Sequence, residues 1–242
     1  MSTQHRNSIE FKVWGRYALF TDPLTKVGGE KFSYQVPTYE ALKGICKSIY
    51  WKPTLIWVID EVRVMKRIRT QTKGTKPQEF GGGNTLAIYT FLADVEYQVR
   101  AHFVWNDSRL ELVADQNEYK HHNIAKKMLV RGGRQDIFLG TRDCQGYVEP
   151  CEFGSEVSAF DGAGELAFGL MFHGFDYPDE TGGDKLHARF WQQKMIDGRI
   201  KFDRPEDCSV RKFVREMRVK QFAAGINQRS VQDEDTEIAS LQ

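Results

Sequence analysis

The chain has 242 residues, of which 40% are hydrophobic and 28% are charged, and it contains 21 glycines but only 7 prolines. This composition is typical of a folded protein with one or two domains, and it excludes a disordered or collagen-like chain. No uncharged run reaches the roughly 18 apolar residues of a membrane-spanning helix. Residues 1–10 lack the apolar stretch of a signal peptide. We therefore expect a cytoplasmic protein with no membrane partner.

The strands and helices expected in the first half of the chain follow from its hydrophobic periodicity. Residues 9–14 alternate apolar and polar side chains and predict a strand. Thr38 can cap a helix that runs to about Ile49. Residues 55–64 predict a buried strand, and residues 85–105 predict a strand that is broken near Ala93–Asp94. Apolar residues recur every three or four positions in the helix and predict its core-facing stripe: Tyr39, Leu42, Cys46 and Ile49.

A second helix is expected over residues 117–129, ending at Gly132 and Gly133. Its predicted buried stripe consists of His121, Ile124, Met128 and Leu129. Residues 137–139 and 147–148 then suggest a strand pair. The resulting order of strand, helix, strand, strand, helix and strand is that of a ferredoxin-like or RRM-like unit.

The remaining chain predicts a smaller β region. Residues 158–220 contain short strand-like pieces separated by Gly and Asp turns, with no convincing helix. We therefore expect an α+β protein with an RRM-like (βαββαβ) RNA-binding and catalytic domain over residues 1–155. A small antiparallel β subdomain would cover residues 156–226, and residues 227–242 would form a polar, frayed tail.

Charge is unevenly distributed along the chain, although 34 basic and 33 acidic residues leave a net charge of only +1. Residues 63–76 hold six basic side chains and no acid, and residues 120–142 hold six against Asp136 alone. Residues 143–184 hold ten acids and no Lys or Arg. Most charge runs are simply solvated, but two long basic stretches favour a surface that binds a polyanion. The cations expected to contact phosphates are Lys66, Arg67, Arg69, Lys73, Lys76, Lys126, Lys127, Arg131 and Arg134.

Several kinds of catalytic site are excluded by missing motifs. Gly81–Gly83 lacks the Gly-Lys-Ser/Thr ending of a phosphate-binding nucleotide loop, and no serine elbow or carboxylate cluster stands out. The cysteines have no zinc-site spacing, so we expect reduced, mostly buried thiols and neither metal nor cofactor. The four cysteines are Cys46, Cys144, Cys151 and Cys208.

A phenol, a lysine and two histidines remain as candidates for chemistry: Tyr50, Lys120, His121 and His122. Taken alone, each is more often an ordinary core or surface residue. Together, a proton shuttle near neutral pH, a fixed cation and a phenol suit metal-free RNA cleavage, in which a 2′-OH attacks its own phosphate. Consecutive helical residues point about 100° apart, so His121 and His122 cannot both face one site.

Longer motifs resemble a known family over about residues 8–220. They are Tyr17–Lys31, Pro37–Gly44, Ser48–Pro53, Gly81–Thr85, Asp136–Gly140, Cys144–Tyr147 and Arg204–Cys208. These segments are similar to the CRISPR-associated Cas5 family, type I-C (Dvulg) branch. The resemblance implies an RRM-like domain followed by a C-terminal β subdomain.

The resemblance also implies a function and a catalytic set. In this branch the subunit is an endoribonuclease that cuts the CRISPR repeat transcript and then stays on the 5′ handle of the guide within the Cascade complex. A tyrosine closing the first helix and a Lys-His pair opening the second carry over to Tyr50, Lys120 and His121. The implied partners are repeat RNA and the backbone and large Cascade subunits, with double-stranded DNA as a further candidate. The alternative is a non-catalytic subunit that caps the RNA, in which Lys120 and His121 only contact phosphate.

Overall fold

The computed structural model describes residues 7–23, 25 and 30–219. Its helices are α1 (Tyr39–Ile49), α2 (Glu118–Val130), α3 (Pro178–Thr181) and a 3₁₀ helix (Leu110–Asp115). Its strands are β1 (Ser8–Ala18), β2 (Lys31–Phe32), β3 (Leu55–Val64), β4 (Thr70–Thr75), β5 (Ala87–Trp105), β6 (Ile137–Phe138), β7 (Gln145–Pro150), β8 (Glu165–Asp176), β9 (Lys185–Ile196), β10 (Arg199–Lys201) and β11 (Val210–Glu216). In the part of the chain described, no helix is long and apolar enough to cross a membrane.

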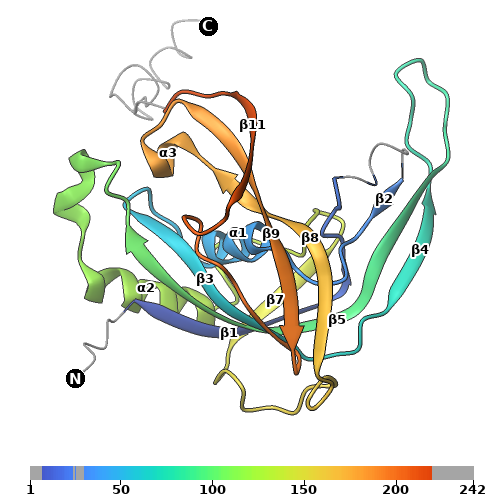
Figure 1. Cartoon of the computed structure of the whole chain (residues 1–242), viewed down its shortest axis with the longest axis horizontal. Helices are drawn as coiled ribbons and strands as arrows, with labels where there is room; N and C mark the ends of the chain where they lie inside the picture. Colours follow the sequence, from blue (N-terminus) through green and yellow to red (C-terminus); the bar gives the residue numbers. More distant parts are fainter. Residues whose placement is uncertain (1–6, 24, 26–29, 220–242) are drawn as a thin grey trace, which may run out of the picture.

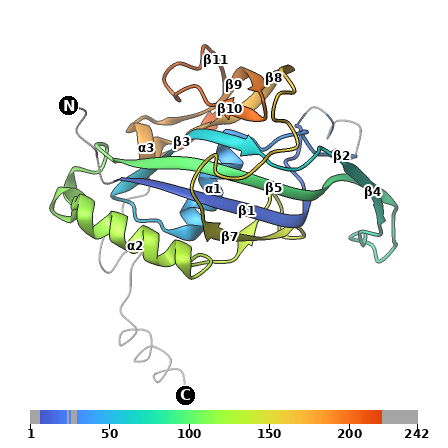
Figure 2. The same cartoon turned by 90° about the horizontal axis from the view of Figure 1, so that it is seen from below.

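The strands form one continuous, mainly antiparallel sheet. Its order is β11-β9-β10-β3-β5-β1-β7-β6, with β8 on β9, and with β4 and the short parallel strand β2 on β5. In Figure 2 the strands β8 to β11 appear at the top and α2 at the bottom, with β3, β5 and β1 between them. The fold is therefore mixed α/β and dominated by an antiparallel sheet.

Helix α1 begins and ends where the sequence predicts. The Thr38 hydroxyl accepts a hydrogen bond from the Ala41 N–H at 3.2 Å and caps the helix. The chain turns to an extended conformation at Tyr50, whose N–H donates to the Cys46 carbonyl at 2.9 Å. All four residues of the predicted stripe are buried in the core, which confirms the prediction: Tyr39, Leu42, Cys46 and Ile49.

Strand β5 is continuous, so the predicted break near Ala93–Asp94 is wrong. Asp94 nevertheless has a φ of 54°, a left-handed conformation that Asp tolerates better than most residues. On one edge of β5, residues 97–105 pair with β3, whereas residues 87–92 pair with β4. Asp94 therefore lies where this edge of β5 changes its partner strand from β4 to β3. The β4–β5 hairpin extends away from α2 (Figures 1 and 2).

Helix α2 differs from its prediction in its buried face. The Asn117 side chain caps it by accepting from the Lys120 N–H at 3.0 Å. The fully buried stripe is His121, Ala125 and Leu129, at a spacing of four residues, while Ile124 and Met128 are only partly buried. The helix packs on β1 and β7 along this narrower stripe. Ala125 was not expected in the stripe because a small side chain contributes little to a hydrophobic pattern.

The C-terminal strands are longer than the short pieces expected from the sequence. β8 and β9 have twelve residues each, and the short helix α3 lies between them. Their pairing shifts register near Gly169 and Gly174, and these irregularities break the alternation that would have revealed one long strand. β8 also packs on α1, where the His173 ring stacks on Tyr39 at a centroid distance of 4.2 Å.

Candidate active site

Tyr50 is held by the end of α1 and by the strand that follows. Its carbonyl accepts a hydrogen bond from the Trp57 indole at 2.7 Å, which ties the residue to β3. The residue is 1% exposed, and burial raises the pKa of its phenol. The phenol therefore stays protonated at neutral pH and acts as a hydrogen-bond donor.

The Tyr50 hydroxyl lies 2.8 Å from Nδ1 of His121, in the first turn of α2. The imidazole is fully buried, and the Trp105 ring meets it edge-on at 5.6 Å between centroids. Trp105 also lines a groove of about 450 Å³, together with Asn7, His102, Phe103, Val104 and Glu118. Two of the three predicted catalytic side chains are thus in direct contact.

The main chain of Asp115 determines which nitrogen of His121 carries hydrogen. Nε2 lies 2.8 Å from the Asp115 carbonyl oxygen, which can only accept a hydrogen bond. Nε2 must therefore be the protonated nitrogen. In the neutral ring Nδ1 is then the acceptor of the Tyr50 O–H, so both ring nitrogens are occupied.

The Asp115 carboxylate joins the third predicted residue to the other two. Oδ1 pairs with the Lys120 ammonium, and Oδ2 accepts from the Thr54 hydroxyl at 2.7 Å. Oδ2 also lies 3.4 Å from His121 Nε2. Hydrogen bonds from Lys120 and Thr54 lower the pKa of the Asp115 carboxyl, so it is ionised at neutral pH. Lys120 itself remains half exposed.

Sequence reasoning missed Asp115 and Thr54. Thr54 follows α1, whereas Asp115 ends the 3₁₀ helix 61 residues later, and no local pattern links such distant positions. The one available signal was an acid placed five residues before Lys120, just before the start of the predicted helix.

His122 lies away from this cluster. Its Nε2 is 3.0 Å from the Ser8 carbonyl, on the first residue of β1. Within the candidate site, Tyr50, Asp115 and Lys120 all gather on the His121 side of α2.

The expected RNA-binding cations fall into two groups, one associated with α2 and the other with β4 (Figure 1). One group lies on and after α2 and is exposed: Lys126, Lys127, Arg131 and Arg134. The other lies before, on and just after β4, with Arg67, Arg69 and Lys76 exposed. Lys66 pairs with Asp94 at 2.8 Å, and the Lys73 ammonium lies 3.2 Å from the centre of the Tyr17 ring.

One basic residue of the first stretch is not on the surface. Arg63 is 4% exposed and donates two hydrogen bonds to the Asp161 carboxylate, at 2.7 and 2.9 Å. The sequence-based expectation that the whole stretch from residue 63 faces a polyanion is therefore wrong at its first residue. The alternation of β3 places Arg63 inward, where an acid from the second half of the chain neutralises it.

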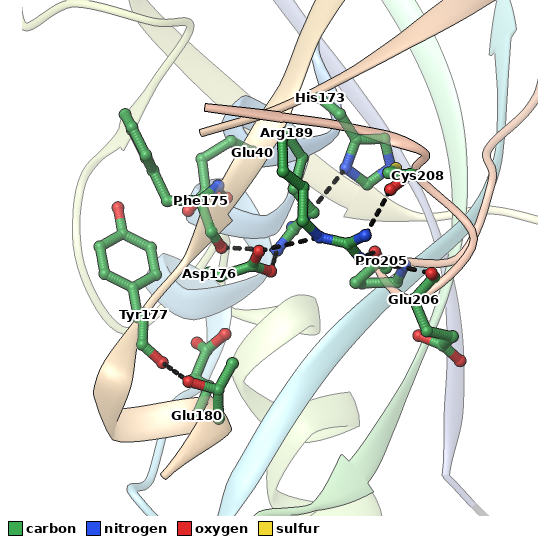
Figure 3. Close-up of polar contacts among 12 residues, drawn as sticks. Glu40, His173, Phe175, Asp176, Tyr177, Glu180, Arg189, Pro205, Glu206 and Cys208 are labelled. Atoms are coloured by element: carbon green, nitrogen blue, oxygen red, sulfur yellow. Dashed lines mark hydrogen bonds and ion pairs between the residues drawn. The ribbon is translucent and has the colours of Figure 1, made fainter. Parts of the chain in front are cut away.

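A second polar cluster lies near the opposite end of α1 (Figure 3). Arg189 on β9 pairs with Asp176, and its Nη1 donates to the Phe175 carbonyl at 2.7 Å. Its Nε lies 3.4 Å from His173 Nδ1, and Arg211 reaches Asp176 from β11 at 3.2 Å. This cluster ties β8, β9 and β11 together, and no sequence motif indicates it.

Neither cluster provides a metal site. Across residues 7–23, 25 and 30–219, no three His, Cys, Asp or Glu side chains are grouped so that they could hold a metal ion. Cys46, Cys144 and Cys208 are buried as expected, whereas Cys151 is partly exposed.

The sequence model of the CRISPR-associated protein Cas5 family, in its Cas5d form, matches residues 8–203. This match identifies a CRISPR-associated protein. More narrowly, the chain belongs to the Cas5 family of type I-C.

Two relatives carry the name CRISPR pre-crRNA endoribonuclease Cas5d. The protein from Mannheimia succiniciproducens is 33% identical over 149 residues, which cover 52% of this chain and 64% of that relative, just under two-thirds of its length. The protein from Thermus thermophilus is 27% identical over 187 residues, which cover 74% of this chain and 77% of that relative.

Two solved structures have the same fold. One is the crystal structure of a CRISPR-associated protein, with a TM-score of 0.71 and 34% identity. The other is a functionally uncharacterized protein from Streptococcus mutans, with a TM-score of 0.71 and 36% identity. Each alignment covers 85% of this chain and 96% of the compared chain.

Proposed function

We propose that this protein is an endoribonuclease that cleaves CRISPR repeat transcripts at the repeat hairpin without a metal ion. The attacking group would be the 2′-OH beside the scissile phosphate, which leaves a 2′,3′-cyclic phosphate. The observation that carries this proposal is the 2.8 Å contact between Tyr50 and His121, with Lys120 joined to it through Asp115. The two relatives named as pre-crRNA endoribonucleases support the same activity.

Each side chain has a distinct proposed role. His121 acts as a general acid once its ring is protonated: the imidazolium gives its Nε2 proton to the leaving 5′-oxygen and becomes the neutral ring, while the attacking 2′-OH loses its proton to water. The Lys120 ammonium stabilises the negative charge that builds up on the pentacoordinate phosphate. In the resting neutral ring Tyr50 donates its hydroxyl hydrogen to Nδ1 and so orients the imidazole, because its raised pKa keeps the phenol protonated at neutral pH.

The RNA is expected to approach across the exposed cations of α2 and β4. Phosphate contacts by Arg67, Arg69, Lys76 and the α2 group would give salt-dependent affinity. After cleavage the protein would stay on the 5′ handle of the guide RNA in the type I-C Cascade complex, beside the backbone and large subunits. Double-stranded DNA is a further proposed partner, and the cytoplasm is the proposed compartment.

The domain carrying the site is proposed to be RRM-like. Strands β7, β1, β5 and β3 are neighbours in this order and pair antiparallel, which corresponds to the fourth, first, third and second strands of a βαββαβ unit. Helix α1 connects β1 to β3, and α2 connects β5 to β7, as such a unit requires. Residues 1–155 and 156–226 remain the proposed division, and the tail over 227–242 lies outside the described residues.

A non-catalytic role is the second candidate, and the burial of His121 favours it. The imidazole is fully buried and both of its nitrogens have partners, so it presents no free nitrogen to an RNA strand in this conformation. Cleavage requires the Asp115 carbonyl to give up its position at Nε2. A protein that only caps the RNA would not require this movement.

The two candidates are distinguished by incubating the purified protein with repeat RNA in EDTA. Endoribonuclease activity predicts one discrete cut in chelator, and no cut when the nucleotide at the scissile position is 2′-deoxy, because its nucleophile is missing. Binding without cleavage of the all-ribose RNA would establish the capping role. Activity that is lost in EDTA and restored by magnesium would contradict the proposed mechanism.

A further inference from the structure

The two groups proposed to contact the scissile phosphate already share one partner. Lys120 Nζ pairs with Asp115 Oδ1, while His121 Nε2 lies 2.8 Å from the Asp115 carbonyl oxygen and 3.4 Å from Oδ2. The Thr54 hydroxyl is the third donor, at 2.7 Å from Oδ2. Three donors from two elements therefore converge on the oxygens of a single anionic residue.

We propose that Asp115 occupies the subsite of the scissile phosphodiester, that RNA must displace it, and that Thr54 is a further phosphate contact. This inference rests on the proposed function, because it assigns Lys120 and His121 to the phosphate. Chemical similarity supports the exchange. A carboxylate and a phosphodiester each carry one negative charge on two equivalent oxygens, and both accept charge-assisted hydrogen bonds from the same kinds of donor.

The element that carries Asp115 is weakly anchored. None of the six residues of the 3₁₀ helix Leu110–Asp115 is buried, and no side chain caps its N-terminus. Leu110 is 76% exposed and Val113 is 52% exposed, so little apolar contact resists displacement. Besides the contacts of Asp115, the segment is held by Arg109, which pairs with Asp179 at 2.9 Å. Segments with few buried contacts open at low cost, as a displaceable occupant requires.

A different role for Asp115 would give the opposite experimental result. In catalytic triads a carboxylate orients the imidazole and stabilises its protonated form, and its removal slows the chemical step. If Asp115 acts in this way, its removal lowers the cleavage rate at saturating RNA. If Asp115 competes with phosphate, its removal strengthens binding.

The test measures affinity for repeat RNA that carries a 2′-deoxy nucleotide at the scissile position and so cannot be cut. Asp115→Ala and Asp115→Asn are compared with Glu111→Gln. This control removes one negative charge from the same 3₁₀ helix, at a side chain that pairs with Arg109. We expect both Asp115 variants to bind this RNA about two- to fivefold more tightly than the wild type. The gain has the size of a partly exposed ion pair, because the RNA no longer has to displace the Asp115 carboxylate from Lys120. The control should stay within about twofold of the wild type.

Two further arms complete the test. The concentration of inorganic phosphate that halves the cleavage rate should be lower for Asp115→Ala than for the wild type, by the same factor as the gain in RNA affinity. For Glu111→Gln this concentration should equal that of the wild type. Adding Thr54→Val to Asp115→Ala should reverse part of the gain in affinity, because the hydroxyl donor to phosphate is lost.

Unchanged or weaker RNA binding by both Asp115 variants would overturn the inference. A lower cleavage rate at saturating RNA, without tighter binding, would instead assign Asp115 to positioning His121. Failure of the wild type to cut all-ribose repeat RNA would contradict the proposed activity alone, since the binding comparison uses RNA that cannot be cleaved.

Discussion

His121 and His173 occupy similar environments at the two ends of α1. Both are fully buried, and Nε2 of each lies within 3.0 Å of the backbone carbonyl of an aspartate, Asp115 or Asp203. Each also contacts a tyrosine that α1 positions. Tyr39 begins the helix and stacks on His173, whereas Tyr50 follows its last residue and bonds to His121.

The two sites differ in the charge next to the imidazole. His173 faces the Arg189 guanidinium, and burial together with this cation lowers the pKa of His173 to about 3. His121 faces the Asp115 carboxylate at 3.4 Å and a neutral phenol. The charged group beside the ring, an arginine at His173 and an aspartate at His121, is therefore the clearest structural difference between the two sites.

The largest effect is expected from removing the imidazole that we assign to catalysis, His121, and comparing it with removal of the neighbouring His122. His121→Ala should lower the single-turnover cleavage rate by about 10²–10⁴, the usual effect of losing a proton-transfer group, while repeat RNA still binds. Lys120→Ala should also cut poorly and still bind. His122→Ala is the matched control and should remain active. An inactive His122→Ala beside a normal His121→Ala would move the assignment to His122.

Stability should depend on the cluster around His173. Arg189→Ala should lower the free energy of unfolding by about 3 kcal/mol, because it leaves Asp176 largely buried with one cation fewer. Arg211→Ala removes the more exposed partner of the same carboxylate and should cost about 1 kcal/mol or less. Urea denaturation measures both values. Equal losses of unfolding free energy in the two variants would show that the buried position of Arg189 does not make its ion pair more important than that of Arg211.

The pH dependence of the free energy of unfolding should show the lowered pKa of His173. An unfolded histidine takes up a proton near pH 6.5, whereas folded His173 resists protonation down to about pH 3. Stability from this residue is therefore complete above pH 6.5. Below that pH it falls by about 1.4 kcal/mol per pH unit until the folded pKa is reached. Denaturation between pH 7 and pH 5 should show this slope, and His173→Gln should flatten it. An unchanged slope in the variant would refute the assignment.

The smallest effect is expected from removing exposed cations that we propose contact RNA phosphates. Neutralising Lys66, Arg67 and Arg69 together should weaken RNA binding, with a salt dependence reduced by about 0.7 per lost phosphate contact. Arg67 and Arg69 should account for most of the loss, because Lys66 is paired with Asp94. The control removes three exposed cations from β9 and β11, on the His173 side: Lys185, Lys194 and Arg215. Similar losses in both triple variants would mean that net charge alone governs affinity.

Local features of the sequence predicted local structure well. The Thr38 cap and the apolar stripe of α1 follow from the spacing of residues within one helix. The position of α2, between Asn117 and the glycines 132 and 133, follows from local sequence in the same way. β8 was predicted as fragments because it carries an extra residue at each of two register shifts, near Gly169 and Gly174, which disrupt its alternation.

The candidate site was predictable only in part. Tyr50, Lys120 and His121 stood out by residue type and by family resemblance, and the fold brings them together. Asp115 and Thr54 did not stand out, because their importance lies in contacts between distant segments. The pairing of Arg63 with Asp161 was hidden for the same reason, since the two residues are 98 positions apart.

The hydrogen bond from His121 to position 115 ends on the main chain, and this has an evolutionary consequence. Every amino acid carries that carbonyl, so a library of substitutions at position 115 would detect the loss of the carboxylate and leave the backbone acceptor in place. Residue 115 can therefore drift among descendants of this chain while the imidazole keeps its orientation. Comparison of sequences at this position would understate its part in holding the ring.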